Sequence, residues 1–251
     1  MEFSGKVAFV SGAGNGIGRA AALLLAERGA KVCVADYDAA AAAVTAEAIR
    51  AAGGEAVSAG GDVADRAAAT AMVDLAVQTF GKLDCALNNA GITHPQDHDW
   101  DDDAFQRSLD VNLKGVFYCM KAELAHMEKA GRGSIVNTAS IAAMIASVAP
   151  NLPGYTSSKH AVMGLTKVAA LKYARMGIRV NAVLPGVTGT NMVREVMEHS
   201  AEARHTLENF SPMGRIAEPS EIAEAALFLM SDRASFITAH GLVADGGVTV
   251  Q

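Results

Sequence analysis

The stretch that decides the fold is the glycine-rich segment Ser11-Gly12-Ala13-Gly14-Asn15-Gly16-Ile17-Gly18. It follows an apolar run at 7–11 and precedes an amphipathic segment at 17–28, so we expect a strand that turns directly into a helix. Glycines allow a tight turn and let an anionic ligand approach the backbone N–H groups at the helix N-terminus. Asp36 ends the next apolar run and can accept hydrogen bonds from ribose hydroxyls. Together these features predict a dinucleotide site.

Short apolar runs alternate with amphipathic segments along the whole chain. The expected strands cover residues 7–11, 31–35, 56–59, 84–87, 133–138, 179–184 and 241–244. The expected helices cover residues 17–28, 39–52, 66–80, 104–129, 155–175 and 220–230. This alternation predicts an α/β fold in a single domain over residues 1–251, a Rossmann-type doubly wound parallel sheet of about seven strands with helices on both faces. A ligand crevice is then expected at the carboxyl ends of the strands.

The composition argues against several kinds of partner. The net charge is −6 and the Lys and Arg residues are scattered, so we expect no nucleic-acid partner. No apolar run reaches the roughly 18 residues of a membrane span, and the first residues do not resemble a secretory leader, so we expect a cytoplasmic protein without membrane contact. Cys33, Cys85 and Cys119 have no paired spacing and are expected to be buried free thiols.

The residue pair Tyr155 and Lys159 carries the predicted chemistry. The two are four positions apart, so on a helix they share one face. A nearby ammonium and the positive ring of an oxidised nicotinamide would stabilise phenolate and lower the pKa of Tyr155 from its reference of about 10. Tyr155 could then act as base in alcohol oxidation and as acid in ketone reduction. Ser140 follows the run at 133–138, so its hydroxyl is expected at the same crevice to hold the substrate oxygen.

These motifs, taken in order, resemble the short-chain dehydrogenase/reductase family, whose common form has about the length of this chain. The family's TGxxxGxG pattern appears at 11–18 with Ser11 for Thr, and its NNAG segment appears at 88–91. By resemblance, Asp62-Val63 would contact the adenine, and the segment at 185–190 would hold the carboxamide end of the cofactor. Asn112 resembles the family's asparagine that holds a water in a relay to the lysine.

The resemblance implies a catalytic tetrad of Asn112, Ser140, Tyr155 and Lys159. Cofactor contacts are expected at Gly12, Asn15, Gly16, Ile17, Gly18, Asp36, Asp62, Val63, Asn89, Gly91, Tyr155, Lys159, Pro185, Gly186, Val187 and Thr190. The predicted cofactor is NAD, because Asp36 would repel the 2′-phosphate of NADP and neither the glycine segment nor Tyr37 offers a cation. The resemblance also implies a homotetramer in which the helical stretches 104–129 and 155–175 pack across one interface.

The substrate is predicted from two apolar stretches. Residues 141–153 carry no charge and are expected to line the crevice, and residues 187–217 are expected to form a lid over it. The apolar side chains of the lid allow two interpretations: they form one apolar face toward the crevice, or they only pack the lid and the tetramer. These side chains are Met192, Val193, Val196, Met197, Leu207 and Phe210. The first alternative predicts an uncharged, largely apolar cyclic or medium-chain secondary alcohol as substrate.

Three alternatives accompany this interpretation. A 3-oxoacyl thioester reductase has the same family architecture, although Asp36 argues against the NADPH that such enzymes usually use. A catalytically silent NAD-binding redox sensor would not need the intact tetrad. The run at 94–103 holds two histidines and five aspartates, but we expect these acids to cap the helix beginning near Ala104 rather than to bind a metal. His94 and Gln96 are expected as walls of the substrate crevice.

Overall fold

The computed structural model describes residues 1–146, 151–191, 193–194, 197 and 201–250. Its centre is a seven-stranded sheet in the order β3-β2-β1-β4-β5-β6-β7, and every neighbouring pair is parallel. The strands are β1 (Val7–Ser11), β2 (Lys31–Asp36), β3 (Ala56–Gly60), β4 (Cys85–Asn88), β5 (Gly133–Thr138), β6 (Ile178–Pro185) and β7 (Gly241–Ala244). The order reverses between β1 and β4, which is where a doubly wound sheet opens a ligand crevice.

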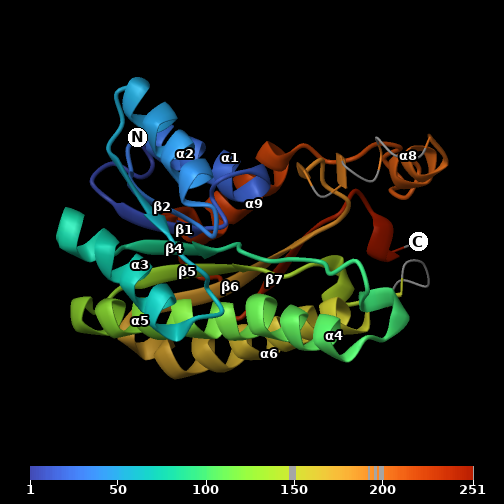
Figure 1. The fold of residues 1–251 in the computed structure, drawn as a ribbon. Coiled ribbons are helices and arrows are strands. Elements are labelled where there is room, and N and C mark those ends of the chain that lie inside the picture. The colour runs from blue at the N-terminus through green and yellow to red at the C-terminus, as the bar shows by residue number, and fades with distance from the viewer. Residues whose placement is uncertain (147–150, 192, 195–196, 198–200, 251) are drawn as a thin grey trace.

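Helices cover both faces of the sheet, as the alternation of the sequence predicts (Figure 1). One layer contains α1 (Gly16–Glu27), α2 (Ala39–Ala51) and α9 (Pro219–Met230), and the other contains α3 (Arg66–Phe80), α5 (Val116–Ala130) and α6 (Pro153–Tyr173). A hydrophobic core lies on each face of the sheet, and successive strand residues point into the two cores alternately. Phe9 of β1 packs with the α3, α5 and α6 layer, and Val10 packs with the α1, α2 and α9 layer. Helix α4 (Asp102–Leu109) continues the α3, α5 and α6 layer beside α6, whereas α8 (Ala201–Glu208) lies away from both layers, toward the same end of the sheet.

The stretch expected as one helix, 104–129, is helical throughout but is not a single α-helix. Helix α4 ends at Leu109, a π-helical turn η2 (Asp110–Gly115) follows, and α5 begins at Val116. The turn keeps the helical direction, so the apolar spacing of the sequence gives no sign of it, but it changes the register in which side chains point. At its end, a Cβ on Gly115 would lie 2.7 Å from Cγ2 of Val63, so the turn packs against the loop after β3.

The three cysteines are free and buried, as predicted. Burial raises the pKa of Cys33 and of Cys85 to about 12, so both remain thiols at neutral pH. Among the described residues, no helix is long and apolar enough to cross a membrane.

A polar cluster is buried between the sheet and its helices. The Asn88 amide donates to Glu123 Oε2 (3.1 Å) and to Asn137 Oδ1 (3.0 Å), and the Asn137 amide donates to Thr166 (2.9 Å). Glu123 Oε1 and Asn88 Oδ1 are buried without a partner among the described residues. Burial raises the pKa of Glu123 to about 8, only partly offset by the bond from Asn88. Because burial penalises the charged carboxylate, the neutral acid is favoured in the folded chain at neutral pH.

Glu123→Gln is expected to raise the melting temperature at pH 8 and to change it little at pH 5. From about pH 4.5 to about pH 8 the unfolded chain releases this proton while the folded chain keeps it, so wild-type stability falls as pH rises. The amide removes this dependence, and each kcal/mol gained shifts the melting temperature by roughly 2–4 °C. Thermal unfolding at pH 5, 6.5 and 8 measures it, with the exposed Glu128→Gln of the same helix as control. A variant that follows wild type at every pH would contradict the assignment.

Candidate active site

A cavity of about 720 Å³ opens at the carboxyl ends of the strands, within the size range of ligand pockets. Nearly all the residues expected to contact the cofactor line it: Gly12, Asn15, Gly16, Ile17, Asp36, Asp62, Val63, Asn89, Gly91, Tyr155, Lys159, Pro185, Gly186, Val187 and Thr190. Ser140 lines the same cavity, so the loops after β1, β2, β3, β4, β5 and β6 converge on one space.

The glycine turn forms an open anion site. Gly12 and Gly16 have φ angles of +61° and +54°, which favour glycine. A Cβ on Gly12 would lie 2.9 Å from Cα of Ala90, so the turn and the loop after β4 are in close contact. Asn15, the N-cap of α1, makes no side-chain capping bond, and the first turn carries no acidic residue. The N–H groups of this helix end therefore remain able to bind an anion in the cavity.

Gly18 and Asn112 do not line the cavity but support it. A Cβ on Gly18 would lie 2.1 Å from the carbonyl oxygen of Gly12, so this glycine lets α1 pack on the turn. Asn112 is fully buried in the π-helical turn, where its Oδ1 accepts from Ile92 N (2.8 Å) and its Nδ2 donates to Ile92 O (2.9 Å). Asn112 thereby fixes the segment that follows NNAG.

One end of the cavity is acidic. Asp36 Oδ2 accepts from the backbone N of Gly14 (2.8 Å), and its Oδ1 accepts from that of Asp38 (3.0 Å). Arg107 lines the cavity nearby and donates to Asp62 (2.9 Å). The sequence gives no sign of this role of Arg107, because its partner is 45 positions away and no motif contains it.

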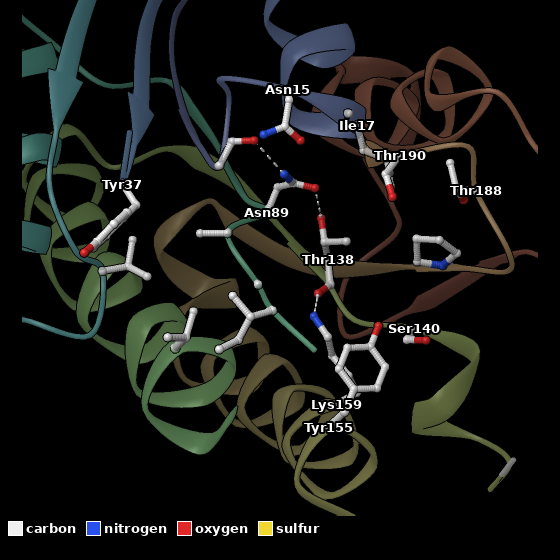
Figure 2. A pocket seen from close by; sticks show the side chains of 18 of the residues that line it. Asn15, Ile17, Tyr37, Asn89, Thr138, Ser140, Tyr155, Lys159, Thr188 and Thr190 are labelled. Carbon is white, nitrogen blue, oxygen red and sulfur yellow. Dashed lines mark hydrogen bonds between the residues drawn. The ribbon is translucent and has the colours of Figure 1, made fainter. Parts of the chain in front are cut away.

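The opposite end brings together three of the four predicted catalytic residues (Figure 2). The Tyr155 ring points toward Ser140, which begins the short turn η3 (Ile141–Ala143) after β5. Lys159 Nζ lies 5.5 Å from the Tyr155 ring centre and donates to the carbonyl oxygen of Thr138 (2.9 Å). A Cβ on Gly91 would lie 3.3 Å from both Lys159 Nζ and Asn112 Oδ1, so the fourth residue faces the same small space.

Burial dominates the electrostatics of this end. It lowers the pKa of Lys159 to about 8. It also raises the pKa of Tyr155, and a hydrogen bond with Ser140 lowers that pKa in part. The predicted lowering by Lys159 is therefore not seen in the chain alone, because desolvation of the phenolate outweighs its stabilisation by hydrogen bonding.

The acidic run at 94–103 has two capping roles. Asp101 accepts from the backbone N of Ala104 (2.8 Å), which confirms the predicted cap of α4. Asp97 instead turns inward to α6. Among the described residues, no group of acids, histidines or cysteines is arranged to hold a metal ion. His94 lines the cavity as expected, whereas Gln96 is exposed and does not.

The expected lid segment begins and ends side by side. Gly189 N donates to Ala217 O (2.9 Å), and Ala217 N donates to Val187 O (3.0 Å). Of the apolar set expected in the lid, Val193 and Leu207 line the cavity, Met197 and Phe210 do not, and Met192 and Val196 lie outside the described residues. Residues 147–150 also lie outside them, and no described residue of 141–153 lines the cavity. Among the described residues of these two stretches, the apolar side chains that line this cavity therefore come from 187–217 rather than from 141–153.

The fold and the site define an oxidoreductase with a nicotinamide cofactor that acts on alcohols, and the chain belongs to the short-chain dehydrogenase/reductase family. A family model described as enoyl-(acyl carrier protein) reductase matches residues 12–249. A crystal structure of a short-chain type dehydrogenase/reductase from Mycobacterium marinum superposes with a TM-score of 0.93 at 36% identity, covering 100% of this chain and 98% of that one.

Two curated relatives match over nearly their whole length. The cyclohexanol dehydrogenase of Acinetobacter sp. is 43% identical over 99% of this chain and 96% of its own. The 2,5-dichloro-2,5-cyclohexadiene-1,4-diol dehydrogenase of Sphingobium indicum is 44% identical over 99% of this chain and 98% of its own. Both names describe the oxidation of an alcohol on a six-membered carbon ring.

Proposed function

We propose that this protein is an NAD-dependent dehydrogenase that interconverts a cyclic, largely apolar secondary alcohol and its ketone. The observation that carries the proposal is the meeting of Tyr155, Ser140 and Lys159 at one end of the cavity. The apolar side chains of Val193 and Leu207 line the same cavity. The names of the two relatives support a ring-bearing alcohol. A 3-oxoacyl thioester is the weaker candidate, since the described lining contains no cation besides Arg107 and Lys159 to receive an anionic carrier.

The lining of the cavity fits the diphosphate and the adenosine of a dinucleotide. The open N-terminus of α1 suits a diphosphate, and Asp36 at the end of β2 suits the hydroxyls of an adenosine ribose. A 2′-phosphate there would meet this carboxylate. Arg107, the cation at this end, is already paired with Asp62. These features favour NAD over NADP.

The proposed chemistry divides between cofactor and protein. The residues that line the cavity would hold a nicotinamide whose chemistry, when bound, would be to accept the hydride of the carbinol carbon. Tyr155 takes the hydroxyl proton as that hydride leaves, so alcohol becomes ketone and the phenolate becomes phenol. Ser140 holds the substrate oxygen by a hydrogen bond during the transfer. Lys159, as an ammonium, stabilises the phenolate, and Asn112 supports the proton path beside it.

We also propose a homotetramer. Phe117 on α5 and Val168 and Leu171 on α6 are large apolar side chains that are exposed on the single chain. These are the two helices that the family resemblance assigns to one interface. Burial of these side chains against a second copy would remove them from water.

Tyr155→Phe is expected to retain NADH binding and to lose turnover by on the order of 10²-fold or more, because the proton acceptor is gone. Lys159→Met should move the pH at which the rate of alcohol oxidation rises to a higher value, since without the ammonium the pKa of the Tyr155 phenol rises further. Steady-state rates across pH 6 to 10 and NADH fluorescence titrations measure both effects. Tyr173→Phe, in the same helix, is the control. Near-wild-type turnover of Tyr155→Phe would refute the mechanism.

Wild type is expected to prefer NAD strongly over NADP in kcat/KM. Asp36→Ala should narrow that ratio by weakening NAD binding through loss of the ribose hydrogen bonds and by removing the repulsion of the 2′-phosphate. Initial rates with each cofactor at a fixed alcohol concentration measure the ratio. Equal use of the two cofactors by wild type would show that Asp36 does not select the cofactor.

Cyclohexanol and a medium-chain 2-alkanol are expected to exceed a free sugar and a sugar phosphate by at least about tenfold in kcat/KM, because apolar burial contributes to their binding. A hydroxysteroid in the same panel tests how large a ring system the cavity admits. Steady-state kinetics with NAD on all five compounds ranks them. A higher kcat/KM for either sugar would contradict the apolar substrate.

A further inference from the structure

The short turn η1 (Asp97–Asp99), between β4 and α4, carries a buried acid that the proposed chemistry does not use. The Asp97 side chain is 0% exposed. Its Oδ1 accepts from the backbone N of Gly154 (2.8 Å) and its Oδ2 accepts from that of Tyr155 (2.9 Å). Both carboxylate oxygens therefore bind the first turn of α6, and one binds the backbone of the tyrosine itself.

Helix α6 cannot cap itself. Its N-cap residue, Leu152, has no side-chain acceptor, and its first residue, Pro153, has no N–H. The backbone N–H groups of Gly154 and Tyr155 are the donors that normally bond to the side chain of an N-cap residue. Asp97 supplies this cap from 57 and 58 positions away, and its negative charge lies at the positive end of the helix dipole. Two charge-assisted hydrogen bonds offset the cost of burying the carboxylate.

Packing around the cap leaves little room for movement. A Cβ on Gly154 would lie 2.9 Å from Asp97 Oδ1 and 3.0 Å from both Cα of Phe105 and Cβ of Ser108. The start of α6 is therefore held between the η1 turn and α4. The same turn reaches the cavity wall, because Asp97 N donates to the carbonyl oxygen of His94 (3.0 Å).

We propose that Asp97 is a positioning residue that sets where Tyr155 stands relative to Ser140 and the substrate. Tyr155 belongs to α6 and Ser140 follows β5, so the approach of their hydroxyls depends on how the start of α6 is fixed. Asp97 fixes it at the backbone of Tyr155 and ties it to the wall that carries His94. A displacement of about 1 Å at a reacting group can cost on the order of 10²-fold in rate. This inference rests on the proposed role of Tyr155.

Asp97→Ala removes both acceptors, and the near-isosteric Asp97→Asn keeps one and turns an amide donor toward the other N–H. In both variants, kcat for cyclohexanol, counted per NADH-binding site, should fall by about 10- to 100-fold. The Kd for NADH and the KM for NAD should stay within about twofold of their wild-type values. The deuterium isotope effect on kcat with cyclohexan-1-d-ol should rise, because a misplaced proton acceptor slows the chemical step. Asp99→Ala, an exposed acid of the same turn, should leave all of these values unchanged.

Hydrogen exchange tests the cap without turnover. The amides of Gly154 and Tyr155 should be protected in wild type and in Asp99→Ala, and should exchange faster in Asp97→Asn. Unprotected amides in wild type, or a kcat in Asp97→Asn within twofold of wild type, would overturn the proposal. An equal fall of kcat in Asp99→Ala would also overturn it, and so would Asp97 variants in which KM rises while kcat stays unchanged. If wild type itself fails to oxidise any alcohol in the panel, the proposed function is wrong, and protected amides would then leave Asp97 as a helix cap without a catalytic consequence.

Discussion

The arrangement of this site depends on one side chain, Asn89, which joins the ends of three strands. Its Nδ2 donates to the carbonyl oxygen of Gly12 (3.1 Å), and its Oδ1 accepts from the Thr138 hydroxyl (3.3 Å). Thr138 in turn accepts, through its carbonyl oxygen, from Lys159 (2.9 Å) (Figure 2). A continuous set of hydrogen bonds thus runs from the glycine turn after β1 to the proposed catalytic lysine on α6. The glycine turn and the chemical end of the cavity, where Tyr155, Ser140 and Lys159 meet, are therefore held in one frame of hydrogen bonds.

The glycines make that frame possible by letting backbones approach. At Gly12 a Cβ would collide with the Ala90 backbone, and at Gly18 it would collide with the carbonyl oxygen that Asn89 binds. A larger residue at either position would separate the turn from the loop after β4 and break the first hydrogen bond of the set. The spacing of these glycines is thus a packing requirement of the strand ends as well as a binding requirement for an anion.

The parts of the fold that could be predicted have local causes. Each strand shows as a short apolar run, and the residues just after these runs meet at the crevice because parallel strands end at the same edge. The π-helical turn at 110–115, the Arg107–Asp62 pair and the cap on α6 could not be predicted. The turn preserves the helical apolar spacing, and the other two depend on partners far apart in sequence. The sequence predicts that Asp97, like Asp101, caps α4, because the burial and the α6 partners of Asp97 leave no mark on the local pattern.

Burial gives the chemical end its dependence on charge. It raises the pKa of Tyr155 and lowers that of Lys159 to about 8, so in the chain alone both side chains shift toward their neutral forms. A site with this bias forms phenolate more readily when positive charge is added close to the phenol. Under the proposed function, the oxidised nicotinamide carries that charge and the reduced one does not. The same tyrosine would therefore be the stronger base when the cofactor can accept a hydride and the better proton donor when it can give one, which matches its protonation to the direction of the reaction.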